Sequence, residues 1–315
     1  MADRAAARLR ALLADARLRP LQAPHDARLG QVLLSTITLR DLTPADLPAA
    51  LALTQAQHWS HQMHDWALHL RLGRGFGARD ADGALLGTAI WWDWDGRLAT
   101  LGLVVVRPDC QGRGIGRMLM NAILAETGER TVGLVATQAG LKLYQDCGFV
   151  VSGSIVQCQG TVASGPASPS PRGVQLRDAG LADRAALFAL DAAAVGARRP
   201  ELLDAVLETG LPSLLAERQG RLVGAALLRP AGRGVTVGPL LAESEDLAIA
   251  LADAALDRID GLARLDLPAS ATRLVAHLET RGLPVVDRVT AMLRGPVPAI
   301  SGPARRFGLV SQAFG

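Results

Sequence analysis

The chain contains the same sequence pattern twice. Leu39-Arg40-Asp41 returns 137 positions later as Leu176-Arg177-Asp178. At the same offset, Gly83, Leu85, Gly87 and Ala89 are matched by Gly220, Leu222, Gly224 and Ala226. Two matches at a single offset indicate a duplicated structural unit, because chance in an alanine-rich chain explains one match but hardly two. We therefore expect two tandem copies of one fold.

Each copy is predicted to be a mixed α/β (α+β) unit, a central sheet flanked by helices. In the first copy, short apolar runs predict strands, Asp95-Gly96 predicts a hairpin, and Thr43-Pro44 predicts the start of a helix. A Ser/Pro/Gly-rich stretch between the copies is typical of a linker. The predicted organisation is an N-terminal helical extension at 1–35, a first domain at 36–159, a linker at 160–172, a second domain at 173–297 and a C-terminal tail at 298–315.

Composition is typical of a soluble cytoplasmic protein. Apolar residues make up 49% of the chain, which is ample for packed cores, and no run is long enough for a membrane span. The net charge is only +3, with both signs interspersed, so nucleic acid is not an expected partner. Three cysteines without metal-ligand spacing are consistent with a reducing compartment. The abundance of arginine over lysine indicates a GC-rich, bacterial genome.

The stretch from Arg107 to Arg117 predicts an anion site. It joins the apolar run Leu101–Val106 to a segment whose apolar residues recur at helical spacing from Ile115. Three glycines within it permit positive φ angles and let backbone N–H groups turn toward one point. The dipole of the following helix attracts negative charge to the same point, so a phosphate is the expected ligand.

The spacing of this loop separates it from two other phosphate loops. Arg117 stands where a dinucleotide loop needs its third glycine, and the closing lysine of a Walker A loop is missing. The pattern Gln111-x-x-Gly114-x-Gly116 instead resembles the pyrophosphate loop of GNAT acyltransferases, which hold acetyl-coenzyme A. Leu143-Tyr144 with Gly148-Phe149 extends the resemblance downstream. The cofactor-binding residues that it implies are Val104, Val105, Val106, Gln111, Gly112, Arg113, Gly114, Ile115, Gly116 and Arg117.

The resemblance implies an N-acetyltransferase that moves acetyl from acetyl-CoA to a primary amine of a small molecule. In that family the sheet splays at its fourth strand, where the backbone of Val104 and Val106 would pair with the pantetheine arm. Tyr144 would act as general acid toward the departing thiolate, since a phenol is protonated at neutral pH. No cysteine occupies an acyl-carrier position, which favours direct attack in a ternary complex. The alternative is a non-catalytic protein that binds or senses acyl-CoA.

The second copy lacks this machinery. Where the first copy has Gln111–Gly116, the second has Ala242–Ala248, which contains no glycine and three carboxylates that would repel a diphosphate. The position of Tyr144 is taken by Leu278. We therefore expect the second copy to be structural, covering the acceptor side of the first or forming a homodimer interface.

An unusual cluster of tryptophan and histidine precedes the loop. All five tryptophans lie between Trp59 and Trp94, and four of six histidines lie between His58 and His69. The cluster could ligate a metal through His58, His61 and His64, could pack the core, or could line an acceptor pocket. We favour the pocket and expect no metal. The predicted acceptor-binding residues are Trp59, His61, Asp65, Trp66 and Trp92.

A general base is also needed, because an alkylammonium must lose a proton before it attacks. The predicted fourth strand carries no carboxylate. Asp93 is the first candidate, because it ends a strand near the expected acyl site. His61 and Asp65 follow it, on the connector after the first helix.

Overall fold

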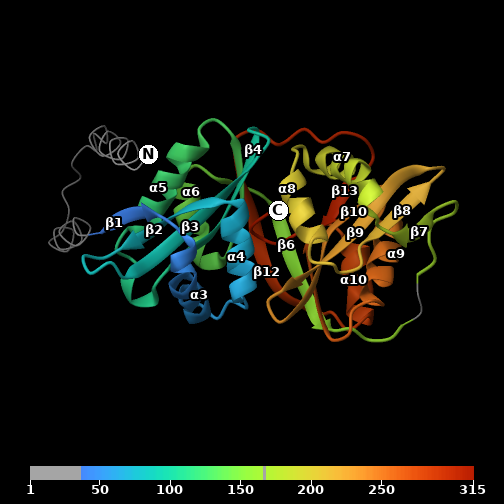
Figure 1. Ribbon diagram of the computed structural model, residues 1–315, viewed down its shortest axis with the longest axis horizontal. Helices are drawn as coiled ribbons and strands as arrows, with labels where there is room; N and C mark the ends of the chain where they lie inside the picture. The colour runs from blue at the N-terminus through green and yellow to red at the C-terminus, as the bar shows by residue number, and fades with distance from the viewer. Residues whose placement is uncertain (1–36, 166–167) are drawn as a thin grey trace.

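The computed structural model describes residues 37–165 and 168–315, so the extension predicted at 1–35 lies outside the described residues. Within these residues, thirteen strands form one sheet in the order β1-β2-β3-β4-β5-β12-β6-β11-β10-β9-β8-β7, with β13 paired to β10. Figure 1 shows the two copies side by side along the long axis, with helices packed on the faces of the sheet. The predicted mixed α/β class is confirmed.

The predicted hairpin at Asp95-Gly96 joins two strands, and the predicted apolar run Leu101–Val106 forms the second half of the later one. The strands are β1 (Thr38–Asp41), β2 (Arg74–Arg79), β3 (Leu85–Trp94), β4 (Leu98–Val106), β5 (Thr131–Ala136), β6 (Val150–Thr161), β7 (Gln175–Asp178), β8 (Leu214–Arg218), β9 (Arg221–Ala231), β10 (Gly234–Ala242), β11 (Leu262–Pro268), β12 (Val285–Arg294) and β13 (Arg305–Gly308). The helices are α3 (Leu47–Ala56), α4 (Met63–Leu72), α5 (Ile115–Thr127), α6 (Leu141–Asp146), α7 (Arg184–Val195), α8 (Pro200–Leu207), α9 (Glu245–Leu256) and α10 (Thr272–Thr280).

The duplication is visible in the order of these elements. The first copy runs β1-α3-α4-β2-β3-β4-α5-β5-α6-β6, and the second runs β7-α7-α8-β8-β9-β10-α9-β11-α10-β12. Element matches element throughout, so the repeat found in the sequence is a repeat of structure. No helix among the described residues is both long enough and apolar enough to cross a membrane.

The two copies exchange strands at the centre of the sheet. β12, from the second copy, pairs with both β5 and β6 of the first, and β6 pairs with β11 of the second. Figure 1 shows β12, dark red, beside the green β6 in the middle of the molecule. The backbone hydrogen bonds of the first copy's sheet therefore depend on a strand of the second copy.

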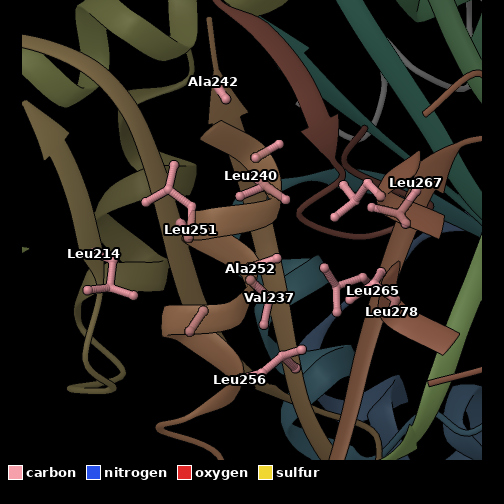
Figure 2. Close-up of a cluster of buried hydrophobic side chains, with 14 of the residues drawn as sticks. Leu214, Val237, Leu240, Ala242, Leu251, Ala252, Leu256, Leu265, Leu267 and Leu278 are labelled. Atoms are coloured by element: carbon pink, nitrogen blue, oxygen red, sulfur yellow. The ribbon is translucent and has the colours of Figure 1, made fainter. Parts of the chain in front are cut away.

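The core of the second copy is complete although its cofactor motif is missing. Figure 2 shows its leucines between α9, α10 and the strands β10 and β11. Leu251, Leu256, Leu265 and Leu278 are fully buried there. Burial of each such side chain contributes about 1.5–3 kcal/mol relative to exposure. Selection for packing explains why the fold pattern persists without the loop.

Adjacent parallel strands separate in both copies, but only one gap stays open. β4 pairs with β5 only over Leu98–Leu101, and the rest of β4 diverges from it. β10 pairs with β11 only over Val235 and Thr236, and beyond them β13 lies antiparallel to β10. Part of the segment predicted as a tail thus fills, in the second copy, the edge that remains free in the first.

Candidate active site

The glycine-rich loop has the conformation that anion binding requires. Gly112 and Gly114 have φ angles of 75° and 84°, in the left-handed region, and Gly114 is the N-cap of the 13-residue helix α5. A residue with a Cβ is strained at such angles, which accounts for both glycines. The backbone N–H groups of the first turn of α5 have no partners within the helix and point out of its N-terminus. The loop is therefore a site for a phosphate group.

The side chains of the loop leave this N-terminus open. Arg113 donates to the carbonyl of Asp109 at 3.0 Å, and Arg117 donates to Asp146 at 2.8 Å. Gln111, which is exposed, donates to the carbonyl of Val106 at 3.1 Å. Both arginines are exposed at the mouth of the loop, where they add positive charge.

The end of β4 carries a bulge beside the open gap. Leu103 has a φ of 51°, and the pairing of β4 with β3 shifts register between Thr88 and Ile90. A branched side chain at positive φ costs of order 1–3 kcal/mol, a strain that proteins tend to retain at functional sites. Because β5 leaves after Leu101, the backbone from Gly102 to Val106 has no strand on its outer edge among residues 37–165 and 168–315. A linear ligand can pair with that edge as an added strand would.

Tyr144 lies on α6, in the core of the first copy. It belongs to the same hydrophobic cluster as Val104, Val106 and Ile115, and its ring packs edge-on against Phe149. A Cβ at Gly140 would come within 2.7 Å of the ring. Burial raises the pKa of the phenol, so the hydroxyl holds its proton at neutral pH. Tyr144 can donate a proton but does not act as a base.

The free thiols of the protein are poorly suited to carry an acyl group. Burial raises the pKa of Cys147, and it raises that of Cys158 to about 11. Cys110 is 2% exposed. A thiol must ionise and be accessible to act as a nucleophile, so none of the three favours an acyl-enzyme.

A cleft of about 790 Å³ opens between the two copies at the bulge of β4. The first copy supplies Trp59, His61, Asp65 and His69 along one wall, with Gly102 and Leu103 at the end nearest the gap. The second copy supplies strands β10, β11 and β12, and residues 311–313 close another side. A Cβ at Gly102 would come within 2.9 Å of Ala313, so the two chain segments are in direct contact. The volume is that of a site for a small molecule.

His61 enters this cleft as a neutral imidazole. Burial lowers its pKa to about 4, with Arg264 and Arg229 acting in the same direction and Asp65 in the opposite one. Its Nδ1 is buried and has no hydrogen-bond partner among the described residues. An unpaired ring nitrogen beside a cleft is free to accept a proton or to bind a ligand.

Asp65 also lines the cleft, but its carboxylate is already satisfied. It accepts the backbone N–H groups of Gln62 at 2.9 Å and Gly232 at 3.0 Å, and Arg229 lies 3.5 Å away. With 3% exposure it ties the first copy to the second. The structure does not support Asp65 as a general base, because its lone pairs are committed to structural donors.

Only one of the three tryptophans predicted for the acceptor wall lines the cleft. Trp59 lies there, half buried. Trp66 and Trp92 are 1% and 0% exposed. Their indole N–H groups donate to Thr54 and to the carbonyl of His69. For Trp66 and Trp92 the prediction is corrected: both are core residues, as large aromatics commonly are.

Asp93 does not reach the cleft either. It lies opposite Ala99 at the start of β4, whereas the gap opens at the other end of that strand. Arg130 holds its carboxylate through two hydrogen bonds of 2.8 and 3.0 Å. β3 and β4 are antiparallel, so the end of β3 lies at the start of β4, far from the acyl site. The prediction of Asp93 as the base is therefore corrected.

Sequence reasoning missed the second copy's share of the cleft. Arg229, Arg264, Asp266 and Asp287 line it and come from β9, β11 and β12. A signal for two of them was present, because Arg264 and Asp266 alternate with leucines inside an apolar strand. Alternation places both on one face of that strand, where they need polar surroundings. Among the described residues, no group of three or more His, Cys, Asp or Glu residues could hold a metal ion.

Comparison with known proteins agrees with this geometry. Models of the acetyltransferase (GNAT) domain match residues 73–151 and 187–302. The chain is 30% identical over 251 residues to the uncharacterized N-acetyltransferase YitH of Bacillus subtilis, covering 79% of this chain and 87% of that one. The chain belongs to the GNAT acetyltransferase family and is an acetyltransferase with two tandem GNAT domains.

Solved structures share the tandem arrangement. A putative acetyltransferase from Pyrococcus horikoshii superposes with a TM-score of 0.72 at 19% identity, over 95% of this chain and 100% of that one. A tandem GNAT protein from the clavulanic acid biosynthesis pathway superposes with a TM-score of 0.57 at 16% identity, over 82% and 99% of the two chains. At these identities the likeness concerns the fold.

Proposed function

We propose that the protein transfers acetyl from acetyl-CoA to a primary amine of a small molecule, by direct attack within a ternary complex. The observation that carries this proposal is the position of the loop. Gly112 and Gly114 present the N-terminus of α5 at the end of β4 whose outer edge is free, and that edge opens into a cleft lined with polar groups. One end of this arrangement suits a diphosphate, the middle a linear arm, and the cleft an acceptor.

Each step of the reaction has a candidate residue. The amine nitrogen attacks the thioester carbonyl carbon, a C–N bond forms, and the C–S bond breaks. We propose that Tyr144 gives its proton to the departing thiolate, because its phenol is protonated and belongs to the same hydrophobic cluster as Val104 and Val106. Backbone groups of the free edge of β4 would polarise the carbonyl.

The amine must also release a proton. Of the three bases predicted from the sequence, His61 alone both faces the cleft and has an unpaired nitrogen. Burial lowers its pKa to about 4, so the ring is neutral but weakly basic. We propose that its unpaired Nδ1 accepts the proton only transiently and releases it to solvent in the cleft.

The second copy holds no acyl-CoA in this proposal. In it, β13 occupies the edge of β10 at Leu240–Ala242, and α9 begins with Glu245 and Asp246 instead of glycines. Carboxylates at a helix N-terminus would repel a diphosphate. Its role is to complete the acceptor cleft. A cytoplasmic location and a homodimer remain predictions.

A thiol-release assay tests the proposal. Wild-type protein with acetyl-CoA and a panel of small primary amines should release coenzyme A and form one acetylated amine per thiol. Tyr144→Phe should lower kcat and leave the affinity for acetyl-CoA unchanged. Binding of acetyl-CoA without turnover on any amine, in wild type as in the variant, would instead indicate the sensing protein considered from the sequence.

A further inference from the structure

The acceptor cleft contains more guanidinium donors than its carboxylates can use. Three arginines of the second copy line it, Arg229, Arg233 and Arg264. Two of the carboxylates that line the cleft, Asp65 and Asp266, are each engaged by one of these arginines and by other donors as well. The charges that remain available in the cleft indicate what kind of acceptor it suits.

Arg229 is a buried cation with unused donors. It is 4% exposed, and its Nε and Nη1 donate to the carbonyls of Val310 at 3.0 Å and Pro230 at 3.1 Å. Its contact with Asp65 is 3.5 Å long, and that carboxylate is satisfied by backbone N–H groups. A guanidinium has five N–H donors, and Nη2 of Arg229 makes no hydrogen bond to any described residue.

Arg264 also has unused N–H donors, and it lies on β11, two strands away from Arg229 on β9. Its Nε and Nη2 each donate to Asp266 at 2.9 Å, and that carboxylate also accepts the side chain of Gln312. Nη1 has no partner in the part of the chain that the structure describes. Arg229 and Arg264 line the same cleft as His61.

The third arginine and one carboxylate remain without a side-chain partner. Arg233, exposed on the β9–β10 hairpin, forms no ion pair with a described residue. Asp287, exposed on β12, accepts only the adjacent backbone N–H of Arg288. The corner made by β9, β10 and β11 is therefore electropositive, and Asp287 offers negative charge on a strand nearer the acyl site.

The geometry points to an acceptor that carries an anionic group, a carboxylate or a phosphate, in addition to its primary amine. We propose that Arg229, Arg264 and Arg233 bind the anion and that Asp287 attracts the ammonium before it is deprotonated. The proposal rests on the proposed function, since it assigns the acceptor of that reaction. It also gives a role to the unused guanidinium donors of Arg229, which is buried, and of Arg264, which is partly exposed.

The strand order limits how far apart the two groups of the acceptor are. β12 and β6 lie between β5, beside the acyl site, and β11, which carries Arg264. Three steps of about 4.8 Å give about 14 Å, and the arginine side chain spans part of that distance. The amine and the anion should thus be separated by several bonds rather than share one carbon atom.

Matched pairs of acceptors test this inference on the full-length protein. Straight-chain ω-amino carboxylates and ω-amino phosphates are compared with neutral alkylamines of the same length. We expect kcat/KM to be at least about 10-fold higher for an anionic member of a pair, because charge-assisted hydrogen bonds to the arginines add to its binding. The better of the two anions identifies the group.

Two variants and a control locate the effect. Arg233→Gln should raise KM for the anionic acceptor about 10-fold and should raise KM for the neutral amine much less. Arg264→Gln should raise KM for the anionic acceptor further. This variant also removes the partner of the buried Asp266 and can disturb the fold. Arg233→Gln changes an exposed side chain and is therefore the safer variant. Arg288→Gln removes the same charge from an exposed residue outside the cleft lining and should change nothing.

The outcomes are distinguishable. Neutral amines acetylated as well as their anionic partners would overturn this inference and leave the proposed function standing. Equal effects of Arg233→Gln on both members of a pair would also overturn it, because the arginine would then act through the fold. Failure to acetylate any amine, with acetyl-CoA bound, would overturn the proposed function and this inference together.

Discussion

The state of His61 predicts how the stability of the folded protein depends on pH. Its pKa is lowered from 6.5 to about 4 by burial, so the unfolded chain binds a proton on this ring more readily than the folded protein does. Stability that depends on the neutral ring is therefore complete above about pH 6.5 and is lost as the pH falls toward 4. His69 shifts in the same direction, since burial lowers its pKa well below the usual value.

The size of the effect follows from the two pKa values. With values of 6.5 and about 4, the linkage relation gives a loss of about 2.5 kcal/mol between about pH 7.5 and about pH 4.5 from His61 alone. Exposed carboxylates also change the free energy of unfolding in this pH range, so the stability of the wild type alone does not report on the ring of His61. The difference between wild type and His61→Gln does, because glutamine does not titrate.

Urea unfolding at a series of pH values measures this difference. We expect the free energy of unfolding of His61→Gln to fall by about 2.5 kcal/mol less than that of the wild type over the range. His64→Gln is the control, because it removes a neighbouring histidine whose side chain is 52% exposed. Parallel curves for wild type and His61→Gln would show that the ring is protonated or solvated in the folded protein and would refute this description of the cleft.

Other substitutions test individual contacts. Tyr144→Phe should lower kcat by about 10²–10³-fold in the thiol-release assay, the scale of a lost general acid, with the Kd of acetyl-CoA unchanged. Asp93→Asn should leave kcat/KM and its pH profile within about 2-fold of the wild type and cost under about 1 kcal/mol in thermal unfolding, because its pair with Arg130 is partly exposed and distant from the cleft. Phe314→Ala should cost about 3–5 kcal/mol of stability by chemical unfolding, since the ring is fully buried 4.4 Å from His69 and 5.0 Å from Trp92, centroid to centroid; a loss below about 1 kcal/mol would show that this packing is loose.

Much of the fold could be predicted from the sequence because local signals agreed with one another. The repeat is observed as a matching order of elements, Asp95-Gly96 joins β3 to β4, and the apolar run Leu101–Val106 lies within β4. The loop could be predicted because its glycines have a backbone requirement, positive φ at 112 and 114, that no other residue type meets as easily.

Long-range placement could not be predicted in the same way. The sequence predicts Asp93 as the general base and Trp92 as an acceptor-binding residue, but nothing local tells which end of a hairpin faces the acyl site. The exchange of β12 into the first copy's sheet has no sequence signature, since any apolar strand satisfies the free edge of β5. The cleft residues of the second copy, Arg229 and Asp287 among them, follow from that exchange.

The helix α4 shows a second limit. Residues His58–Trp66 were treated as a connector, yet Met63–Leu72 form a helix whose first turn is capped by Asp65 through the N–H of Gln62. The same carboxylate contacts Arg229 of the second copy. The capping of a helix by Asp65 is a local signal, so the sequence could in principle predict the helix. The contact of Asp65 with Arg229 is long-range, so the sequence could not predict this interface.

The central claim is that the first copy binds acetyl-CoA and the second does not. Isothermal titration of the full-length protein with acetyl-CoA should give one site per chain, and Gly114→Val, which places a β-branched residue at a φ of 84°, should abolish binding while the protein remains folded. Two sites per chain would contradict the claim that the second copy, with β13 along the edge of β10, holds no acetyl-CoA. A Gly114→Val variant that binds as the wild type does would contradict the assignment of the loop as the acetyl-CoA site.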